Sequence, residues 1–536
     1  MAHLPSPHRL VVCFLVAIGL VVATSTAEEA QPPRLSLREL AAVGAQAPGC
    51  APGTTGQTIG DAPRLDAAGN VSWAVTLRDP DGGFAQALYR WLGGPAELVF
   101  QSGDPAPGNS APFTLFPYAP QTPLINGGGL TFAANIEDPE VVSRDGLWSD
   151  RFGGFERLLL TGDHLPGMPA GTELAGFSAS IRGDLVLARA SFAEGSSLPR
   201  ANEGLWRNRT GPWELVMIRG MRAPGLDGAV FDADPTSAYG PLFFHTARGD
   251  GSVLAQAWVR GRGIDGNNDE ALWIETGSGL QMLVREGARA GGKGKTTFGP
   301  ASSTPTFGAD GENLAPAIND LGWVVFGAIL RSGKTRWNSV WAKRGGSLEL
   351  VARGGLPLSG YGEGDPAPGL PAGATFAAFD GSALNQDGTF AFQGWADEHG
   401  NFFALTEAIW WDAPGTLALV AAAGRPVPGA SGAAYGELTL EGLTGEDVLH
   451  FTASLTGSGV TWANDVALLR ATPDGTVALL LREGDVVEVL DGAGRSTLRT
   501  VASFTFGPGV VTAGRAAARV TFTDGSGGVY LIDPFL

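Results

Sequence analysis

The sequence has almost no cysteine and a shortage of basic residues, and each shortage excludes a class of protein. Its only cysteines are Cys13 and Cys50. Cys13 lies in an N-terminal segment that we expect to be removed, so a disulfide scaffold is excluded. Lys and Arg number 36 against 54 Asp and Glu, which gives a net charge of −18. Because nucleic-acid binding requires a basic face that neutralises phosphates, a nucleic-acid partner is disfavoured.

Long apolar runs are also missing, except for one at the N-terminus. Three basic or titratable residues precede "LVVCFLVAIGLVV" (Leu10–Val22), and the small residues "ATSTA" follow and end at Ala27. This run is shorter than the roughly 20 residues of a membrane-spanning helix and fits a signal peptide. We therefore expect a signal peptide over 1–27, cleavage near Ala27, and a secreted or periplasmic mature chain without a transmembrane segment.

No convincing amphipathic helix follows the apolar run, whereas glycine and proline are abundant. The chain contains 80 Gly, 36 Pro and 14 Trp, and 44% of its residues are hydrophobic. That much apolar surface can offset the conformational entropy of folding, which argues against disorder. Gly and Pro then mark turns between many short strands, so the composition predicts an all-β protein.

A turn followed by a short strand recurs along the chain. It is clearest as "NQDGTFAF" (Asn385–Phe392), "NDLGWVVF" (Asn319–Phe326) and "DAAGNVSW" (Asp66–Trp73). Weaker copies are Asn126–Phe132, Ser180–Leu187, Thr444–Phe451 and Arg515–Phe522. Between residues 237 and 255, "RGDGSVLA" (Arg248–Ala255) fits the spacing better than "SAYGPLFF" (Ser237–Phe244). Such periodicity is typical of repeat architectures.

Two further elements accompany each turn-strand. One is a short strand ending in an aromatic or aliphatic residue, which we call the LW element: Ala87–Tyr89, Gly146–Trp148, Gly204–Trp206, Ala271–Trp273, Ser339–Trp341, Ala408–Trp410, Ala467–Leu469 and Gly528–Tyr530. The other is an "ELV"-type strand that runs into a fragment resembling "GDPAPG", as at Gly103–Gly108 and Gly364–Gly369. Eight such units of about 64 residues account for residues 28–536.

The copies are offset between the chain ends. The segment Leu37–Gly49 carries an "ELV"-type strand with nothing before it, and the C-terminal unit lacks that strand. A ring closed by pairing its two ends requires this offset, because pairing removes the exposed strand edges. We predict one domain over 28–536, an eight-bladed β-propeller with four-stranded antiparallel blades, in which the N-terminal strand completes the last blade. Seven blades is the alternative.

The "GDPAPG" fragments fall between one predicted blade and the next. Pro, Gly and Asp there are typical of turns, so we interpret the fragments as blade connectors. The alternative is that Asp104, Asp163, Asp365 and Asp485 line one face and bind a cation. The LW aromatics are interpreted as packing between sheets, with a sugar-binding platform as the alternative.

The best metal candidate is "DGNNDE" (Asp265–Glu270). Asp265, Asn267 and Asp269 alternate oxygen ligands as calcium loops do. The segment lacks the downstream glycine and bidentate acid of an EF-hand, so an acidic turn is the alternative. Calcium is the one cofactor that the sequence suggests.

Catalytic patterns are scarce. The histidines after residue 27 are scattered, without metal-ligand spacing, and no G-x-S-x-G sequence is present. A glycosidase pair of carboxylates could lie among the loops, since two such acids need only be close in space. Catalytic residues stay unknown, and the sequence favours a protein that is not an enzyme.

The turn-strand resembles the repeat of a bacterial tandem-repeat family named for its NxxGxxAF motif. Asn385–Phe392 matches fully and Asn319–Phe326 matches except at Val325, whereas the copies beginning at Ser180, Thr444 and Arg515 depart from the motif. The resemblance implies a secreted or surface-associated protein, and it implies no activity, so no functional residues carry over.

Two functions follow from these observations. The first is a secreted, non-catalytic propeller that binds an extracellular protein or glycan on the face formed by the connectors and the loops before the LW elements. The alternative is an extracellular hydrolase that acts on polysaccharide through loop carboxylates.

Overall fold

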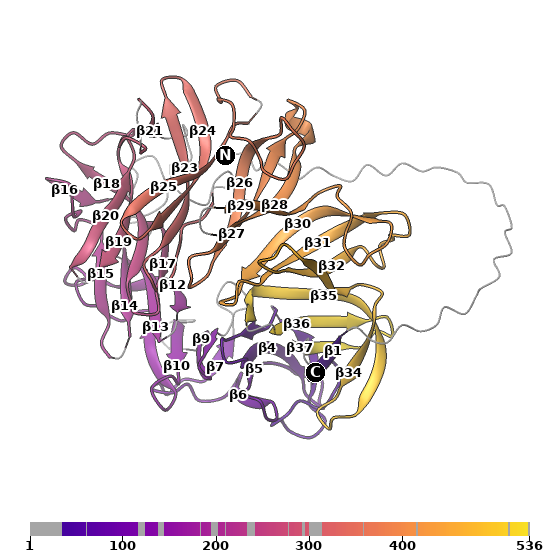
Figure 1. Ribbon diagram of the computed structural model, residues 1–536. Helices are drawn as coiled ribbons and strands as arrows, with labels where there is room; N and C mark the ends of the chain where they lie inside the picture. Colours follow the sequence, from indigo (N-terminus) through magenta and orange to yellow (C-terminus); the bar gives the residue numbers. More distant parts are fainter. Residues whose placement is uncertain are drawn as a thin grey trace. The chain divides into compact units, whose positions relative to one another are not determined.

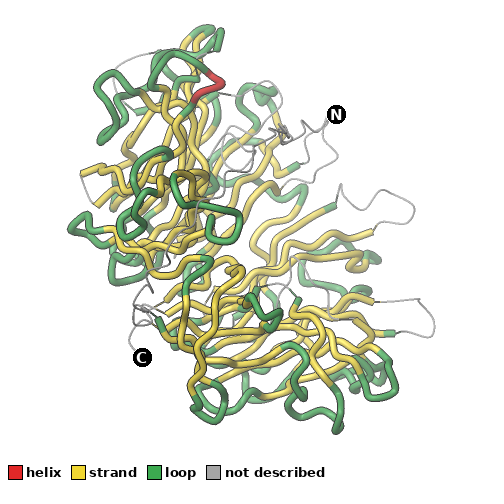
Figure 2. Tube along the Cα trace, turned by 90° about the vertical axis from the view of Figure 1, so that its right-hand side faces the viewer, coloured by secondary structure: helices red, strands yellow, loops and turns green. Residues whose placement is uncertain are grey.

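The computed structural model describes residues 35–60, 62–115, 124–137, 144–182, 184–193, 202–209, 211–232, 242–276, 278–291, 295–299, 314–356, 358–413, 416–512 and 515–533. The expected signal peptide, 1–27, lies outside them. Strands make up nearly all of the regular structure, and the 3-10 helix η2 (Phe402–Ala404) is the single helix of the described residues (Figure 2). Within these residues, no helix has the length and apolarity needed to cross a membrane.

Seven open antiparallel sheets, here called blades 1 to 7, follow one another in chain order (Figure 1). Blade 1 consists of β2 (Thr55–Ile59), β3 (Arg64–Leu65), β4 (Val71–Arg78), β5 (Phe84–Trp91) and β6 (Glu97–Gln101). Blade 2 consists of β7 (Phe113–Leu115), β8 (Leu124–Asn126), β9 (Gly129–Ile136), β10 (Arg144–Ser149) and β11 (Glu156–Leu160). Blade 3 consists of β12 (Glu173–Arg182), β13 (Leu185–Ala193), β14 (Glu203–Asn208) and β15 (Glu214–Ile218). Blade 4 consists of β16 (Ala229–Phe231), β17 (Leu242–Ala247), β18 (Val253–Gly261), β19 (Glu270–Thr276) and β20 (Gly279–Arg285).

Blades 5 to 7 continue the pattern. They are β21 (Thr297–Phe298), β22 (Ala317–Ile318), β23 (Val324–Ser332), β24 (Thr335–Arg344), β25 (Ser347–Gly354); β26 (Thr375–Leu384), β27 (Phe390–Asp397), β28 (Thr406–Ala413), β29 (Thr416–Ala422); and β30 (Ala433–Leu443), β31 (Leu449–Gly457), β32 (Val466–Ala471), β33 (Val477–Arg482). Where a blade has five strands, two short ones pair with the same second strand, as β2 and β3 do with β4. Each blade is therefore four strands wide.

The eighth repeat unit forms a closed sheet. Its strands are β34 (Val486–Leu490), β35 (Ser496–Thr512), β36 (Arg515–Phe522), β37 (Gly527–Asp533) and the N-terminal β1 (Ser36–Ala42). β1 pairs antiparallel with β37, where Leu37 faces Ile532, and parallel with β34, where Leu37 faces Val489. The predicted completion by the N-terminal strand is confirmed, and the second pairing, with the hairpin β34–β35, was not predicted.

Apolar packing joins the sheets into a ring. Eight clusters of buried apolar side chains each straddle two successive sheets, and one of them joins Leu531 of the closed sheet to Trp73 and Ile59 of blade 1. The all-β propeller prediction is confirmed. Seven units form open blades, as in the seven-blade alternative, and the eighth repeat closes on itself through both chain ends.

The repeated turns connect the first and second strands. Asn319 Oδ1 accepts hydrogen bonds from the backbone N–H groups of Leu321 and Trp323, both at 3.0 Å, as expected of Asn in a tight turn. Its Nδ2 donates to the carbonyl of Asn385 in blade 6 at 2.9 Å, and Asn385 Nδ2 donates to the carbonyl of Thr444 in blade 7 at 3.3 Å. These turns therefore also link neighbouring blades.

The register of the predicted copies is correct in most blades. Phe392 faces Trp410 and Ala255 faces Trp273, so the choice of Arg248–Ala255 is confirmed. In blade 3, however, Ala188 and not Leu187 faces Trp206. In the closed sheet the equivalent residue is Ala518 and not Phe522, because Ala518 faces Tyr530. In blade 3, apolar residues on both sides of the strand concealed a shift of one residue. In the closed sheet, the predicted copy begins four residues too late, which leaves the strand parity unchanged.

Candidate ligand-binding face

Strand alternation fixes two faces of the ring. Because successive strands run antiparallel, the connectors and the loops between second and third strands lie at one end of every blade, which we call the connector face. The turns between first and second and between third and fourth strands lie at the other end, the turn face. The sequence prediction that connectors and pre-LW loops share one face is therefore confirmed by the topology.

The connectors have one backbone geometry. Gly103 N–H donates to the carbonyl of Phe113 at 2.8 Å, and Phe113 N–H donates back to the carbonyl of Asp104 at 3.0 Å. The same reciprocal pair recurs elsewhere: Gly44/Gly56/Ala45, Gly162/Leu174/Asp163, Gly220/Phe231/Met221, Gly287/Phe298/Ala288, Gly424/Tyr435/Arg425 and Gly484/Val501/Asp485. In these seven connectors the glycine has positive φ, 96° at Gly103. The fragment Gly364–Gly369 differs: Gly364 does not have positive φ, and Gly355 N–H donates to the carbonyl of Phe376 at 2.8 Å instead.

The connector aspartates serve the backbone. Each carboxylate accepts a hydrogen bond from the N–H three or more residues earlier in the preceding strand, at 2.8–2.9 Å: Asp104 from Gln101, Asp163 from Leu160, Asp365 from Arg353 and Asp485 from Arg482. Arg353 also pairs with Asp365 at 2.6 Å. These four hydrogen bonds support the interpretation that the aspartates stabilise the connectors, because each carboxylate already has a backbone partner.

The LW aromatics bind the connector that enters their own blade. Trp148, Trp206, Trp273, Trp341 and Trp410 are buried to 2% exposure or less. Four of the indoles donate to a connector carbonyl at 2.8–3.2 Å, in the pairs Trp148–Pro107, Trp206–Pro166, Trp273–Pro224 and Trp410–Pro368, and the Tyr89 hydroxyl donates to Pro48. Their packing role is confirmed, and burial removes them as a sugar platform.

The calcium candidate forms a turn between β18 and β19 on the connector face. Asp265 Oδ1 accepts from the backbone N–H of Asn267 at 3.0 Å, and Asp269 N–H donates to Glu286 at 3.2 Å. In the described part of the chain, no three His, Cys, Asp or Glu side chains converge as a metal site. The observed bonds are those of an acidic turn, and calcium binding by Asp265, Asn267 and Asp269 stays a prediction.

The same loop is built a second time in blade 7. Asn268 Oδ1 accepts from the N–H three residues earlier, as Asn464 Oδ1 does, and Arg285 and Arg482 donate to the backbone carbonyls of these two asparagines at 2.6 and 2.7 Å. Each loop ends in an aspartate beside a buried glutamate: Asp269 with Glu286, and Asp465 with Glu483. The repeated letters "ND" and "REG" are the sequence signal that could have found this pair.

The carboxyl pair in blade 7 has unusual protonation. Burial, followed by a hydrogen bond with Asp465, raises the pKa of Glu483 to about 7, whereas an unfolded-state glutamate titrates near 4.3. Folding therefore strengthens proton binding at Glu483. The stabilisation is fully present below about pH 4 and is lost as the pH rises through about 7.

We expect Glu483→Gln to remove this pH dependence. In the variant, glutamine is a permanently neutral equivalent of the protonated acid. Its free energy of unfolding should therefore match that of the wild type at pH 4 and exceed it by about 1–3 kcal/mol at pH 8. Urea unfolding at the two pH values measures the difference. Glu446→Gln, an exposed position of the same blade, should follow the wild type at both; equal behaviour of all three proteins would contradict the raised pKa.

Three strongly exposed aromatic side chains lie on the connector face. Phe403, beside η2 in blade 6, is 93% exposed, and Trp462, in the loop before β32 of blade 7, is 87% exposed. Phe84 of blade 1, directly after the loop that precedes β5, is 71% exposed. Phe403 and Trp462 belong to adjacent blades, so this part of the connector face is a candidate contact surface.

On the turn face, ion pairs and hydrogen bonds connect neighbouring blades. Arg90 of blade 1 pairs with Asp150 of blade 2, Arg207 of blade 3 with Glu275 of blade 4, and Arg344 of blade 5 with Asp412 of blade 6. A polar cavity of about 490 Å³ between blades 3 and 4 is lined by such paired charges. The tripeptide 248–250 also bonds to Asp320 of blade 5. These charged groups link neighbouring blades on the turn face.

The histidines do not form a site. Burial lowers the pKa of His245 and of His450 to about 4 in two different blades. His164 Nδ1 lies 3.0 Å from the carbonyl of Thr172, and His399 sits in the turn before η2. The structure brings none of these four together, as the scattered spacing indicated.

Comparisons with known proteins give a family and a fold. A family of unknown function (DUF7453) matches residues 29–240 and again 195–534, and no curated protein matches. Among solved structures, a Mycobacterium tuberculosis puromycin-hydrolyzing peptidase is 14% identical (TM-score 0.36), with 87% of this chain and 58% of that chain covered. This chain thus spans little more than half of that peptidase.

Two further structures are also only distantly similar. The β-propeller domain of the trilobed protease from Pyrococcus furiosus is 10% identical (TM-score 0.36), with 80% of this chain and 96% of that chain covered. An α-L-arabinanase from Penicillium chrysogenum is 9% identical (TM-score 0.26), with 65% and 90% covered. Similarities this distant carry no argument about activity.

Proposed function

Since the chain belongs to a family of unknown function (DUF7453), we propose its function from the chemistry of its own surface: a secreted, non-catalytic β-propeller that binds a saccharide chain on the connector face. One observation carries the proposal. Phe403 and Trp462, almost fully exposed, stand on equivalent loops of adjacent blades. Exposing an aromatic ring to water is unfavourable unless a ligand covers it. The C–H faces of sugars pack on aromatic rings.

Polar groups beside these rings suit the hydroxyl groups of a sugar. The loop with Phe403 contains Asp397, His399 and Asn401, and the loop with Trp462 contains Asn464. One oxygen each of Asp397, Asn401 and Asn464 accepts a backbone N–H of its own loop, which holds the loop in shape. Carboxylates accept and amides both donate and accept hydrogen bonds, which is the combination that hydroxyl groups require. Export rests on the expected signal peptide, and membership of the NxxGxxAF repeat family likewise stays a prediction.

A polysaccharide hydrolase is the second candidate, favoured by the raised pKa of Glu483 beside Asp465. A carboxyl group kept protonated near neutral pH is what a general acid requires. However, the equivalent pair Asp269–Glu286 stands in blade 4, and Glu483 is only 8% exposed. Because a catalytic site is needed once and a structural device recurs with its repeat, the binding function is preferred.

The proposal is tested by affinity electrophoresis in gels that contain soluble xylan, glucomannan or alginate. We expect at least one of them to retard the wild type, and Trp462→Ala and Phe403→Ala to weaken the retardation about tenfold or more, as loss of a central aromatic contact does. Phe152→Ala is the matched control, since this 42% exposed ring lies on the turn face. No retardation by any of the three, or equal loss in the control, would contradict the proposal.

A further inference from the structure

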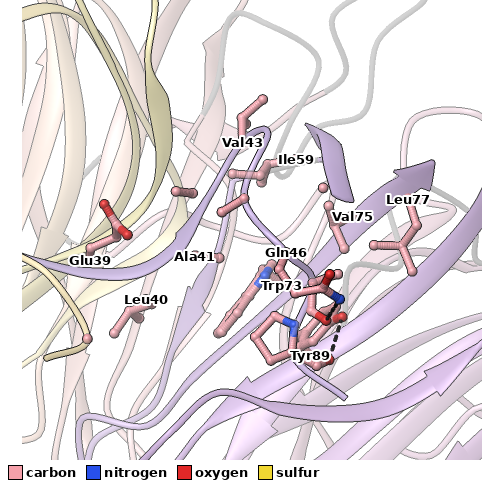
Figure 3. Close-up of a pocket in the computed structure, with 16 residues that line it drawn as sticks. Glu39, Leu40, Ala41, Val43, Gln46, Ile59, Trp73, Val75, Leu77 and Tyr89 are labelled. Atoms are coloured by element: carbon pink, nitrogen blue, oxygen red, sulfur yellow. Dashed lines mark hydrogen bonds between the residues drawn. The ribbon is translucent and has the colours of Figure 1, made fainter. Parts of the chain in front are cut away.

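A cavity of about 160 Å³ lies where the closed sheet meets blade 1 (Figure 3). One wall is formed by Trp73, Val75 and Leu77 of β4, with Tyr89 of β5, and the facing wall by the strand β1 and the chain after it. Val43, 41% exposed, lies at the rim together with exposed connector residues, so the cavity opens on the connector face. Its walls are largely apolar side chains.

The repeat explains what is missing there. The residue that exchanges backbone hydrogen bonds with each connector points at the LW residue of the same blade. It is Phe113, Phe231, Phe298 or Phe376 in blades 2, 4, 5 and 6, and Leu174, Tyr435 or Val501 in blades 3 and 7 and the closed sheet. In blade 1 it is Gly56, which lines the cavity.

In the four blades with phenylalanine, its ring packs on the LW tryptophan. The ring centroids are 4.9 Å apart for Phe113–Trp148, 5.0 Å for Phe231–Trp273, 5.1 Å for Phe298–Trp341 and 4.8 Å for Phe376–Trp410. Three of these pairs are edge-to-face, a preferred geometry for aromatic rings. The cavity beside Tyr89 is thus the space that a phenyl ring fills elsewhere in the ring of blades.

Nothing in the backbone requires glycine at position 56. Gly56 is absent from the residues with positive φ, and a Cβ built on it would meet Val75 Cγ2 at 3.5 Å and the Ala42 carbonyl at 3.7 Å, which is ordinary contact. An empty apolar cavity destabilises a fold. These contacts therefore give no structural reason for glycine at position 56.

The polar groups around the cavity are already bonded. Tyr89 donates its hydroxyl to the Pro48 carbonyl at 3.0 Å. Gln46 donates to the Ala51 carbonyl at 3.0 Å and accepts from Gly53 N–H at 2.7 Å. The carboxylate of Glu39 also lines the cavity, where it would repel an anion, and it already accepts a hydrogen bond from the Tyr530 hydroxyl at 3.4 Å. The site therefore suits an uncharged ligand.

We propose that this cavity binds a neutral, single-ring aromatic compound, whose ring takes the place of the absent phenylalanine side chain and packs edge-to-face on Tyr89. A dry cavity of about 150 Å³ is large enough for benzene, so the volume of this one matches one ring. The site is separate from the loops of blades 6 and 7, and the inference stands independently of saccharide binding.

The test uses phenol as the probe with the purified full chain, and saturation-transfer NMR and thermal unfolding as the measurements. We expect phenol to give saturation transfer and a Tm that rises with the logarithm of its concentration, because it binds the folded state. Gly56→Phe should abolish both effects and should itself raise the Tm by about 1–3 °C. Gly56→Leu, which copies blade 3, is a second blocking variant in case the larger side chain prevents folding.

Val486→Phe is the matched control, because it adds a ring at a 48% exposed position of the neighbouring hairpin, outside the cavity. It should bind phenol as the wild type does. Absence of phenol binding to the wild type, or unchanged binding in a folded Gly56 variant, would overturn the proposal. Equal or tighter binding of benzoate or cyclohexanol would overturn the assignment to a neutral aromatic ring.

Discussion

Leu37→Asp is expected to abolish the cooperatively folded ring. Leu37 is fully buried in β1, where it faces Ile532 on one side and Val489 on the other. A carboxylate at this position would lose its water without gaining a partner, and the strand that closes the ring would separate from both neighbours. We expect a loss of about 4 kcal/mol or more in the free energy of unfolding, measured by urea unfolding.

The control for this prediction lies in the same closed sheet. Leu498 of β35 is 63% exposed, so Leu498→Asp should change the free energy of unfolding by less than about 0.5 kcal/mol. Leu37→Ala keeps the strand apolar, and its loss of stability should fall between the two, at about 2–4 kcal/mol. An unchanged urea midpoint in Leu37→Asp would mean that β1 does not close the ring.

Trp410→Ala is expected to have the second largest effect, about 3–5 kcal/mol. The ring is fully buried between Phe376 and Phe392, at centroid distances of 4.8 and 5.8 Å, and its N–H donates to the Pro368 carbonyl. Trp410→Phe keeps most of the packing but leaves that carbonyl without its donor, so a smaller loss of about 1–3 kcal/mol is expected. Urea unfolding followed by far-UV circular dichroism avoids reliance on tryptophan fluorescence.

Substitutions at two other tryptophans separate the contribution of packing to stability from that of the indole hydrogen bond. Trp341 donates to Ser339 Oγ, which itself donates to the Ala328 carbonyl. Trp341→Phe should therefore cost less than Trp410→Phe, since the serine keeps a partner. Trp462→Ala, at an exposed site, should be nearly neutral. If Trp410→Phe proved as neutral as Trp462→Ala, the indole–proline bond would not contribute to stability.

Much of the candidate site could not be read from the chain. The sequence placed "DGNNDE" and the pre-LW loops on the correct face, because strand alternation alone determines the end of a blade at which a loop emerges. It did not identify Glu483 beside Asp465, although both residues belong to short motifs, "REG" and "ND", that occur in blades 4 and 7. Their proximity depends on how two loops of one blade pack, and the pKa of Glu483 depends on burial.

The sequence by itself determined the repeat, the strand composition, the connectors and the closure by the N-terminal strand. These features are written locally in every copy, in turn residues whose backbone preferences are their own, such as Asn319 and Gly103. The tertiary structure alone decided the bond from Trp410 to Pro368, the second pairing of β1 with β34, and the vacant ring position at Gly56. Each of these joins residues about 30 or more positions apart, so it exists only when the sheets are packed together.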